Sequence, residues 1–199
     1  MKIKVCGMTN AEANSQLLQY EPIDFLGSIQ FPPSARYFPS KLATSRPTIG
    51  VFVNETAANI LSKVDAFALS GVQLHGNETI KLIEQLPKEL MIIKAFSISK
   101  KEDLLQTTTF EGKVDYFLFD TSTPQHGGSG QQFDWSILQL YQGSTPFFLS
   151  GGIGPEDVCK IQAFSHPLFA GIDINSCFEI QPGQKNAQAV IHFIQQLNA

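Results

Sequence analysis

The chain has 199 residues, with 14 lysines and arginines against 18 aspartates and glutamates, which gives a formal net charge of −4. This mild acidity argues against a nucleic-acid partner, because proteins that bind nucleic acids usually present a basic face. With 43% hydrophobic and 16% charged residues, the chain can bury a sizeable core, which excludes intrinsic disorder as the expected state. A chain of this length is expected to form one domain, residues 1–199.

The cysteines indicate whether a disulfide or metal site is expected, and the apolar segments indicate where in the cell the protein is located. Cys6, Cys159 and Cys177 are odd in number and far apart, so neither a disulfide scaffold nor a metal site is expected. The first residues lack the apolar run of a signal peptide, and the uncharged segment 135–155 is interrupted by glycine, proline and glutamine. We therefore predict a cytoplasmic protein that does not interact with a membrane.

Short runs of β-branched and aromatic residues predict eight strands. Their expected ranges are 3–6, 25–29, 49–53, 71–74, 91–96, 116–119, 147–149 and 169–172. Segments with helical spacing lie between them, at 11–20, 56–64, 79–86, 99–106, 134–141, 155–164 and 186–197, with a weaker one at 40–45. Apolar strands that alternate with helices indicate an α/β protein whose parallel strands are covered on both faces.

Eight units of about 25 residues each fit a compact (β/α)₈ TIM barrel, near the lower size limit of that fold. A doubly wound open sheet is the alternative architecture. It is disfavoured because no GxGxxG pattern follows the first strand, where the sequence reads Cys6-Gly7-Met8-Thr9.

The carboxyl ends of barrel strands surround one shared cleft, so chemistry is expected there. The residues at these ends are, in chain order, Cys6, Gln30 with Arg36, Asn54, His75, Phe96, Asp120, Gly151-Gly152 and Asp173-Ile174-Asn175-Ser176. The glycine-rich turn after the seventh strand lets backbone N–H groups approach an anion closely. Together with the polar turn after the eighth strand, it indicates a phosphate-binding site rather than a merely tight turn.

Cys6 and Asp120 are the candidates for acid–base chemistry. A lone cysteine is most often a small buried hydrophobe, and a catalytic thiolate needs a cationic environment, so the residue pattern alone favours a structural role for Cys6. Asp120 ends an apolar strand, where an unpaired acid is costly, so a functional role is favoured over a cap for the next loop.

Two further side chains have open interpretations. Arg36 follows the proline-led loop that begins at Phe31 and is either a bidentate carboxylate ligand over the cleft or a solvated surface residue. His75 is more often a hydrogen-bonded structural histidine than an acid or base at such a position.

Seven segments in this order resemble the phosphoribosylanthranilate isomerase family of tryptophan biosynthesis, over almost the whole length of the chain. They are Lys4-Val5-Cys6-Gly7-Met8-Thr9, Phe31-Pro32-Pro33-Ser34-Ala35-Arg36-Tyr37, Gly50-Val51-Phe52-Val53-Asn54, Val72-Gln73-Leu74-His75-Gly76, Gly127-Gly128-Ser129-Gly130 with Phe133-Asp134-Trp135, Ser150-Gly151-Gly152, and Gly171-Ile172-Asp173-Ile174-Asn175-Ser176. Each segment alone is a weak signal, but seven in the right order make a strong one.

The resemblance implies an Amadori rearrangement of N-(5-phosphoribosyl)anthranilate to 1-(2-carboxyphenylamino)-1-deoxyribulose 5-phosphate, without a cofactor. It implies that Asp120 is the general acid that opens the furanose ring and that Cys6 is the general base that removes the proton from C2 of the ribose. Arg36 would hold the anthranilate carboxylate. The turns at Gly151-Gly152 and at Asp173-Ile174-Asn175-Ser176 would hold the phosphate. His75 and Asp173 would line the cleft.

Three positions depart from the family pattern. Gln131 stands where lysine is common, Cys177 where glycine is common, and Asn186 where an acid is more usual. These departures concern substrate affinity and loop behaviour more than reaction type.

Rival functions are other phosphosugar enzymes and a barrel that binds a phosphorylated ligand without turnover. A metal-dependent epimerase would need paired histidine and aspartate ligands, and only His75 is available among the histidines at strand ends. An isomerase acting on ProFAR would need an acid in place of Cys6, and a ring-closing synthase would need a lysine such as Lys94. A monomer or a homodimer is expected.

Overall fold

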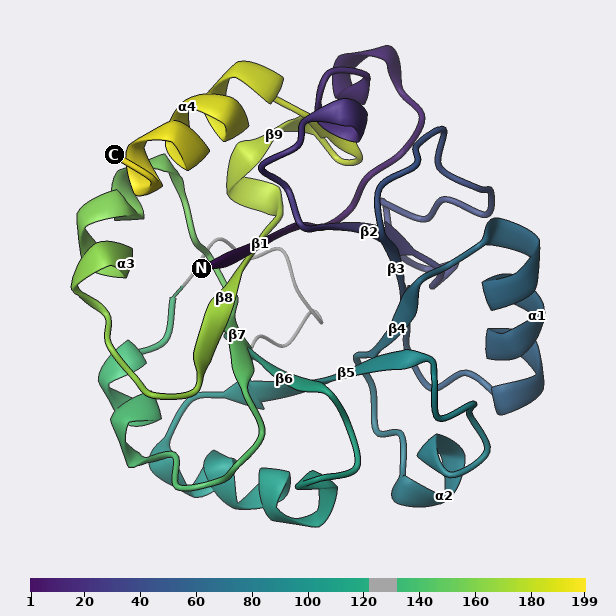
Figure 1. The fold of residues 1–199 in the computed structure, drawn as a ribbon, viewed down its shortest axis with the longest axis vertical. Coiled ribbons are helices and arrows are strands. Elements are labelled where there is room, and N and C mark those ends of the chain that lie inside the picture. Colours follow the sequence, from purple (N-terminus) through teal and green to yellow (C-terminus); the bar gives the residue numbers. More distant parts are fainter. Residues whose placement is uncertain (122–131) are drawn as a thin grey trace.

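The computed structural model describes residues 1–121 and 132–199. Eight parallel strands form a closed barrel in chain order, with the helices around it (Figure 1). The strands are β1 (Lys2–Val5), β2 (Phe25–Ile29), β3 (Thr48–Phe52), β4 (Gly71–Leu74), β5 (Met91–Ile98), β6 (Tyr116–Thr121), β7 (Phe147–Leu149) and β8 (Phe169–Ile174). The expected eight strands and the TIM-barrel fold are thus confirmed.

The barrel closes where β1 pairs with β8. Lys2 is opposite Gly171 and Lys4 is opposite Asp173 in this parallel register. Because every one of the eight strands has two neighbours, the sheet has no open edge, and the doubly wound alternative is excluded.

The outer layer is less helical than the sequence pattern predicts. Its α-helices are α1 (Ala57–Phe67), α2 (Ile80–Ile83), α3 (Val158–Ala163) and α4 (Ala187–Leu197). The connection from β2 to β3 has no helix. The chain also contains the 3₁₀ helices η1 (Glu12–Asn14), η2 (Leu17–Gln19), η3 (Lys101–Phe110), η4 (Trp135–Leu140), η5 (Pro155–Asp157) and η6 (Ser176–Phe178). In η3 the run of β-branched threonines at 107–109 disfavours a regular α-helix.

The helix predicted at 40–45 is wrong, since this segment is an irregular connection. Its internal backbone bond runs from the Thr44 N–H to the Leu42 carbonyl, and its other polar groups bond mainly to the segment after β1. The Asn10 amide donates to the Lys41 carbonyl and accepts from the Ala43 N–H, and the Thr44 hydroxyl donates to the Leu18 carbonyl.

Side chains point alternately into the barrel and outward to the surrounding layer along each strand. The interior contains an apolar cluster of Phe25, Ile49, Ile93, Ala95, Leu118 and Phe148. The residues that flank Leu118 and Phe148 along their strands belong instead to the cluster that packs against the surrounding segments. The same alternation directs Cys6, Asp120 and Asp173 to the interior at the carboxyl ends of their strands.

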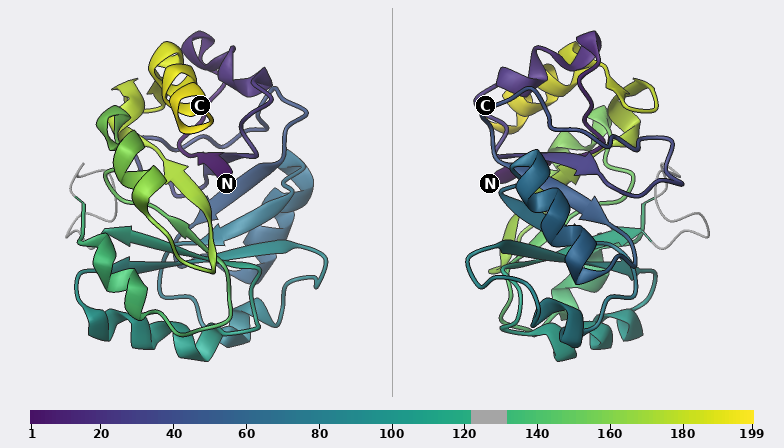
Figure 2. Two further views of the ribbon diagram at one scale, coloured as in Figure 1. Left: turned by 60° about the vertical axis from the view of Figure 1, so that its left-hand side comes forward. Right: turned by 90° about the vertical axis from the view of Figure 1, so that its right-hand side faces the viewer.

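A small antiparallel hairpin follows β8 and contacts the segment after β1. It consists of β9 (Glu179–Gln181) and β10 (Gln184–Lys185). Beyond it, α4 lies beside the segment that carries η1 and η2, as the yellow and purple ribbons of Figures 1 and 2 show. The carboxyl-terminal part of the chain therefore contacts the loop that follows Cys6.

In the described part of the chain, none of the helices combines the length and the apolar character that a membrane crossing requires.

Candidate active site

Cys6 lies directly after β1 in a buried polar cluster. The Lys4 Nζ atom lies 2.9 Å from the Asp173 Oδ1 atom, and both side chains are buried. Gly27 on β2 makes room for this group, because a Cβ atom there would stand 2.8 Å from the Cys6 Sγ atom and 3.1 Å from the Lys4 Nζ atom. On the other side, the Ser150 hydroxyl is 3.5 Å from the second Asp173 oxygen.

This environment decides how easily the Cys6 thiol ionises. Burial raises the pKa of the Cys6 thiol, while the positive charge of Lys4 acts to lower it. Burial also acts to lower the Lys4 pKa, but the neighbouring Asp173 and Cys6 raise it overall, so Lys4 stays an ammonium. The sequence pattern left Cys6 with a structural role as the simpler interpretation. The buried cation beside it opposes the effect of burial on the thiol pKa, although burial remains the larger effect.

Asp120 extends from β6 toward His75, which follows β4. The His75 Nε2 atom lies 3.4 Å from the Asp120 Oδ2 atom, and the Gln73 amide lies 2.8 Å from the His75 Nδ1 atom. The other Asp120 oxygen accepts the Thr121 N–H at 2.8 Å. The Asp173 carboxylate interacts electrostatically with both Asp120 and Cys6. Asp120 and Cys6, the candidates for acid and base, therefore share one mouth of the barrel.

The glycine turn after β7 borders Asp120. Gly151 and Gly152 have φ angles of +87° and +67°, which favour glycine. A Cβ atom on Gly151 would also stand 2.8 Å from the Asp120 Oδ1 atom. The absence of a side chain therefore lets the backbone of this turn lie close to the Asp120 carboxylate. η5 begins three residues later, at Pro155, and continues as α3, in place of the continuous helix predicted at 155–164.

The turn after β8 lies next to the glycine turn. Ser176 begins η6, and Asn175 precedes it as the N-cap residue. The Cys177 thiol donates to the Gly152 carbonyl at 3.5 Å, which joins the two turns. The two segments predicted to bind phosphate are thus brought together.

Arg36 is held by a carboxylate of the protein. Its Nε and Nη2 atoms donate to the Glu179 carboxylate at 2.7 to 3.0 Å, and Lys185 Nζ contacts the same carboxylate at 2.7 Å. Burial acts to raise the Glu179 pKa, but Arg36 and Lys185 hold it below its usual range. Gly7 packs against this cluster, since a Cβ atom there would meet Asn175, Arg36 and Lys185 within 3.3 Å.

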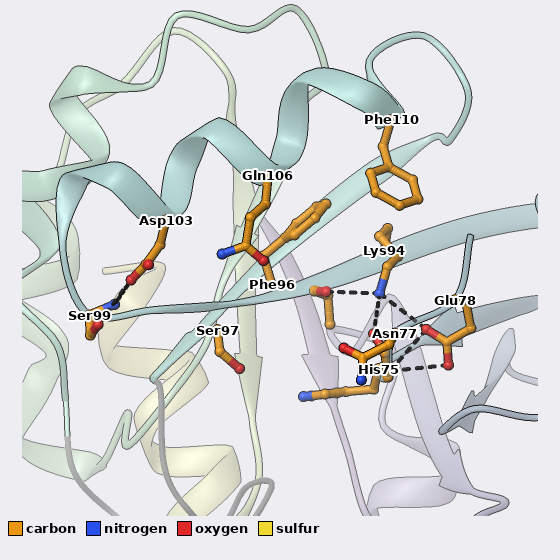
Figure 3. A pocket seen from close by; sticks show the side chains of 12 residues that line it. His75, Asn77, Glu78, Lys94, Phe96, Ser97, Ser99, Asp103, Gln106 and Phe110 are labelled. Carbon is orange, nitrogen blue, oxygen red and sulfur yellow. Dashed lines mark hydrogen bonds and ion pairs between the residues drawn. The ribbon is translucent and has the colours of Figure 1, made fainter. Parts of the chain in front are cut away.

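Lys94, the residue that a ring-closing synthase would use, is held on the outer side of β5. Its Nζ atom donates to Glu78 at 3.1 Å, as Figure 3 shows, and also to the Leu74, Gly76 and Ala95 carbonyls. It borders a cavity of about 490 Å³ between β5, η3 and the loop after β4. Because its N–H groups are engaged and burial lowers its pKa, we interpret Lys94 as a support for the loop that carries His75.

Three of the strand-end candidates lie outside the cluster. The Gln30 amide donates to Ser28 and to the Phe38 carbonyl, and Asn54 accepts the Asn77 N–H, so both stabilise loops. Phe96 packs among aromatic rings, with Phe117 at 5.2 Å between centroids.

Sequence reasoning missed four polar residues of the site: Lys4, Ser150, Glu179 and Lys185. Two of them could have been found from the sequence. Lys4 is two residues before Cys6, so both side chains point to the same face of the strand, and Ser150 directly precedes the glycine turn.

The departures from the family pattern have different outcomes. Gln131 and the glycine segment 127–130 lie outside the described residues. Asn186 is the N-cap of α4, and its side chain accepts the Ala189 N–H, which is a role that asparagine performs well. Among residues 1–121 and 132–199, no three histidine, cysteine, aspartate or glutamate side chains are grouped as metal ligands.

Comparisons with known proteins agree on one family. The family model described as N-(5'phosphoribosyl)anthranilate (PRA) isomerase matches residues 3–196. An N-(5'-phosphoribosyl)anthranilate isomerase of Phocaeicola vulgatus is 47% identical over 99% of this chain and 98% of its own length. That of Thermotoga maritima is 33% identical over 98% of this chain and 97% of its own length.

Solved structures give the same result. The T. maritima phosphoribosyl anthranilate isomerase superimposes with a TM-score of 0.83 and 31% identity, covering 100% of this chain and 98% of that one. A second isomerase structure is in complex with reduced 1-(o-carboxyphenylamino)-1-deoxyribulose 5-phosphate. It superimposes with a TM-score of 0.82 and 29% identity, and the match covers 100% of this chain and 98% of that one. The chain therefore belongs to the N-(5'-phosphoribosyl)anthranilate isomerase family.

Proposed function

We propose that this chain isomerises N-(5-phosphoribosyl)anthranilate with Cys6 as the general base and Asp120 as the general acid. Membership of the family makes the chain an isomerase of tryptophan biosynthesis. The roles of individual residues are our proposal. The observation that carries it is the buried group of Lys4, Cys6 and Asp173, which shares one barrel mouth with Asp120 and His75.

Asp120 performs the first step, the opening of the sugar ring. It donates a proton to the furanose ring oxygen while the bond between that oxygen and C1 breaks. The anthranilate nitrogen supplies the electron pair that forms the C1–N double bond, and a protonated Schiff base results. His75 contacts Asp120 from the loop after β4 and orients its carboxyl group.

Cys6 performs the second step. Its thiolate removes the proton from C2, and the released electron pair forms a C1–C2 double bond as the C1–N double bond becomes single. The enolamine then tautomerises, with the C2 hydroxyl becoming the ketone and C1 gaining a proton. The bonded electrons move only within the substrate, so the reaction requires no external oxidant or reductant.

The same geometry supports a placement for the two anionic ends of the substrate. The phosphate binds at the paired turns of Gly151-Gly152 and Asn175-Ser176, where positive φ angles and the Cys177 contact bring backbone groups together. The carboxylate of the anthranilate binds Arg36, which lies beside Gly7, the residue after Cys6.

A phosphorylated small molecule is the partner that this family acts on, and a solved relative binds the reduced product. One T. maritima relative is described as a dimer from which monomers were generated. For this chain, a monomer or a homodimer stays a prediction, as does a cytoplasmic location.

The decay of substrate fluorescence tests the proposal. Wild-type protein is compared with Cys6→Ser and Asp120→Asn, and with Cys159→Ser as a control at an exposed cysteine. Loss of a general acid or base lowers kcat by about a hundredfold or more. Folded variants of Cys6 and Asp120 that retain wild-type rates contradict the assigned roles, and wild-type protein that binds the product without turnover favours a non-catalytic barrel.

A further inference from the structure

Lys185 is a fully buried lysine that the proposed mechanism does not use. It stands at the end of β10, in the hairpin after β8. Its Nζ atom contacts the Asn175 Oδ1 atom at 2.6 Å, the Glu179 Oε1 atom at 2.7 Å and the Asn175 carbonyl at 3.3 Å. Burial lowers the Lys185 pKa, and Glu179 acts against this effect. Three oxygen acceptors around one nitrogen match the three N–H groups of an ammonium, so we assign Lys185 a positive charge.

Glu179 stands between two cations. It accepts three hydrogen bonds from Arg36, one from Lys185 and one from the Gly183 N–H at 3.1 Å. This arrangement fixes the Arg36 guanidinium through its Nε and Nη2 atoms. Within the described residues, the Arg36 Nη1 atom has no hydrogen bond and Nη2 makes one, so N–H groups on both atoms remain for a ligand.

The charges of these three residues decide what the site attracts. Arg36 and Glu179 alone sum to zero, and a neutral pair gives little attraction for a carboxylate. Lys185 adds a positive charge, so the cluster is net +1 and is neutralised when one carboxylate binds. Buried charges interact more strongly than exposed ones, so the net charge of this cluster has a large effect on its affinity for a carboxylate.

We propose that Lys185 is a positioning residue that makes the aglycone subsite selective for a carboxylate, by compensating the charge of the Glu179 that orients Arg36. The inference rests on the proposed contact between Arg36 and the anthranilate carboxylate. It deepens that function, because it names the group that lets a negatively charged side chain hold Arg36 without repelling an anionic substrate.

Calorimetric binding of two product analogues tests the inference. One is the reduced 1-(o-carboxyphenylamino)-1-deoxyribulose 5-phosphate, and the other is the same compound without the carboxyl group. Both analogues can lose affinity through the contact of Lys185 with Asn175 in the phosphate-binding turn. Lys185→Met is expected to weaken binding of the carboxylated analogue by about tenfold or more beyond that shared loss, the usual size of a charge-assisted contact. Equal losses for both analogues, or no loss, overturn the inference. Lys41→Met, at an exposed position, is the control.

A second variant keeps the test valid if Lys185→Met does not fold, because removal of one partner of a buried ion pair is strongly destabilising. Glu179→Gln with Lys185→Met removes both charges and leaves Arg36 at +1. The preference for the carboxylated analogue is expected to stay within a few-fold of wild type. A loss of that preference in the folded double variant contradicts the charge count.

Arg36→Met separates this inference from the proposed function. If wild type does not prefer the carboxylated analogue, or Arg36→Met retains the preference, the proposed Arg36 contact is wrong and the inference falls with it. If Arg36→Met loses the preference and Lys185→Met keeps it, only the inference is overturned.

Discussion

Lys4 and Asp173 form a buried ion pair across the seam where β1 meets β8, with 2.9 Å between the Lys4 Nζ and Asp173 Oδ1 atoms. The two residues are directly opposite in the strand register, so closure of the barrel itself creates the pair. Cys6 is the next interior residue after Lys4 on β1. The fold therefore places a fixed cation beside the proposed base before any substrate binds.

The first prediction concerns the pH dependence of activity. Burial raises the pKa of the Cys6 thiol, and a base works only when deprotonated, so kcat/KM of wild type is expected to rise with pH through the neutral range. Lys4→Met removes the positive charge that acts to lower this pKa. The rising limb of the profile should then move to higher pH, and kcat/KM at pH 7 should fall by about tenfold if the limb moves by about one pH unit.

Steady-state rates between pH 6 and 10 check this prediction, with Lys2→Met as the control at the far end of the same strand. Because Lys4→Met leaves Asp173 unpaired, the double variant with Asp173→Asn is measured in parallel. A pH profile of Lys4→Met that superimposes on that of wild type contradicts the role of Lys4.

The second prediction concerns the space beside the thiol. A Cβ atom at Gly27 would stand 2.8 Å from the Cys6 Sγ atom and 2.9 Å from the Cys6 Cα atom, so Gly27→Ala must displace the base. Overpacking of this kind destabilises by about 1–3 kcal/mol, and we expect kcat to fall by at least about tenfold.

Gly112→Ala is a matched control, because a Cβ atom there meets nothing within 4 Å, while its φ angle of +67° imposes a strain of about 1–2 kcal/mol. Urea unfolding and turnover are measured for both variants. If both lose stability and neither loses activity, the fit around Cys6 is not important for catalysis.

The third prediction concerns His75. The contact between its Nε2 atom and Asp120, and the contact of its Nδ1 atom with Gln73, orient the proposed acid. His75→Ala is expected to lower kcat by about tenfold to a hundredfold through misplacement of Asp120. His192→Ala on the exposed side of α4 should leave kcat unchanged, and equal kcat values for the two variants would rule out a positioning role for His75.

The fourth prediction concerns stability. Glu78 and Lys94 are buried partners, and the Glu78 carboxylate also accepts the Asn54 and Gly76 N–H groups that fix the loop after β4. Lys94→Met leaves the Glu78 charge uncompensated and should lower the free energy of unfolding by about 3–5 kcal/mol. Glu78→Gln with Lys94→Met should recover part of this loss in denaturant titrations. If the double variant is less stable than Lys94→Met, the loss of stability in Lys94→Met does not come from the uncompensated charge of Glu78.

The fold could be predicted from the sequence because each strand is a short apolar run with its own boundary signals. Three strands, β2, β4 and β7, have the expected bounds, and the others differ by one or two residues at an end. The outer layer was harder to predict. Segments such as 11–20 and 40–45 have helical composition, but 11–20 forms only two short 3₁₀ helices. Segment 40–45 bonds mainly to residues 10–18 instead, and that competition depends on tertiary contacts.

The site was predictable where it follows from the topology. Cys6, Asp120, Asp173 and the glycine turn stand at strand ends, so a barrel brings them together. Glu179 could not be predicted as the partner of Arg36, because 143 residues separate the two in sequence. Their contact depends on a hairpin whose position only the folded chain defines.

Single-turnover kinetics with substrate deuterated at C2 of the ribose test the central claim most directly, because they separate the step of Cys6 from the step of Asp120. In Cys6→Ser the removal of the C2 proton should become rate-limiting, which produces a clear primary isotope effect. In Asp120→Asn ring opening should limit the rate, and the isotope effect should disappear. The opposite pattern, with the effect present in Asp120→Asn and absent in Cys6→Ser, would contradict the assignment of acid and base.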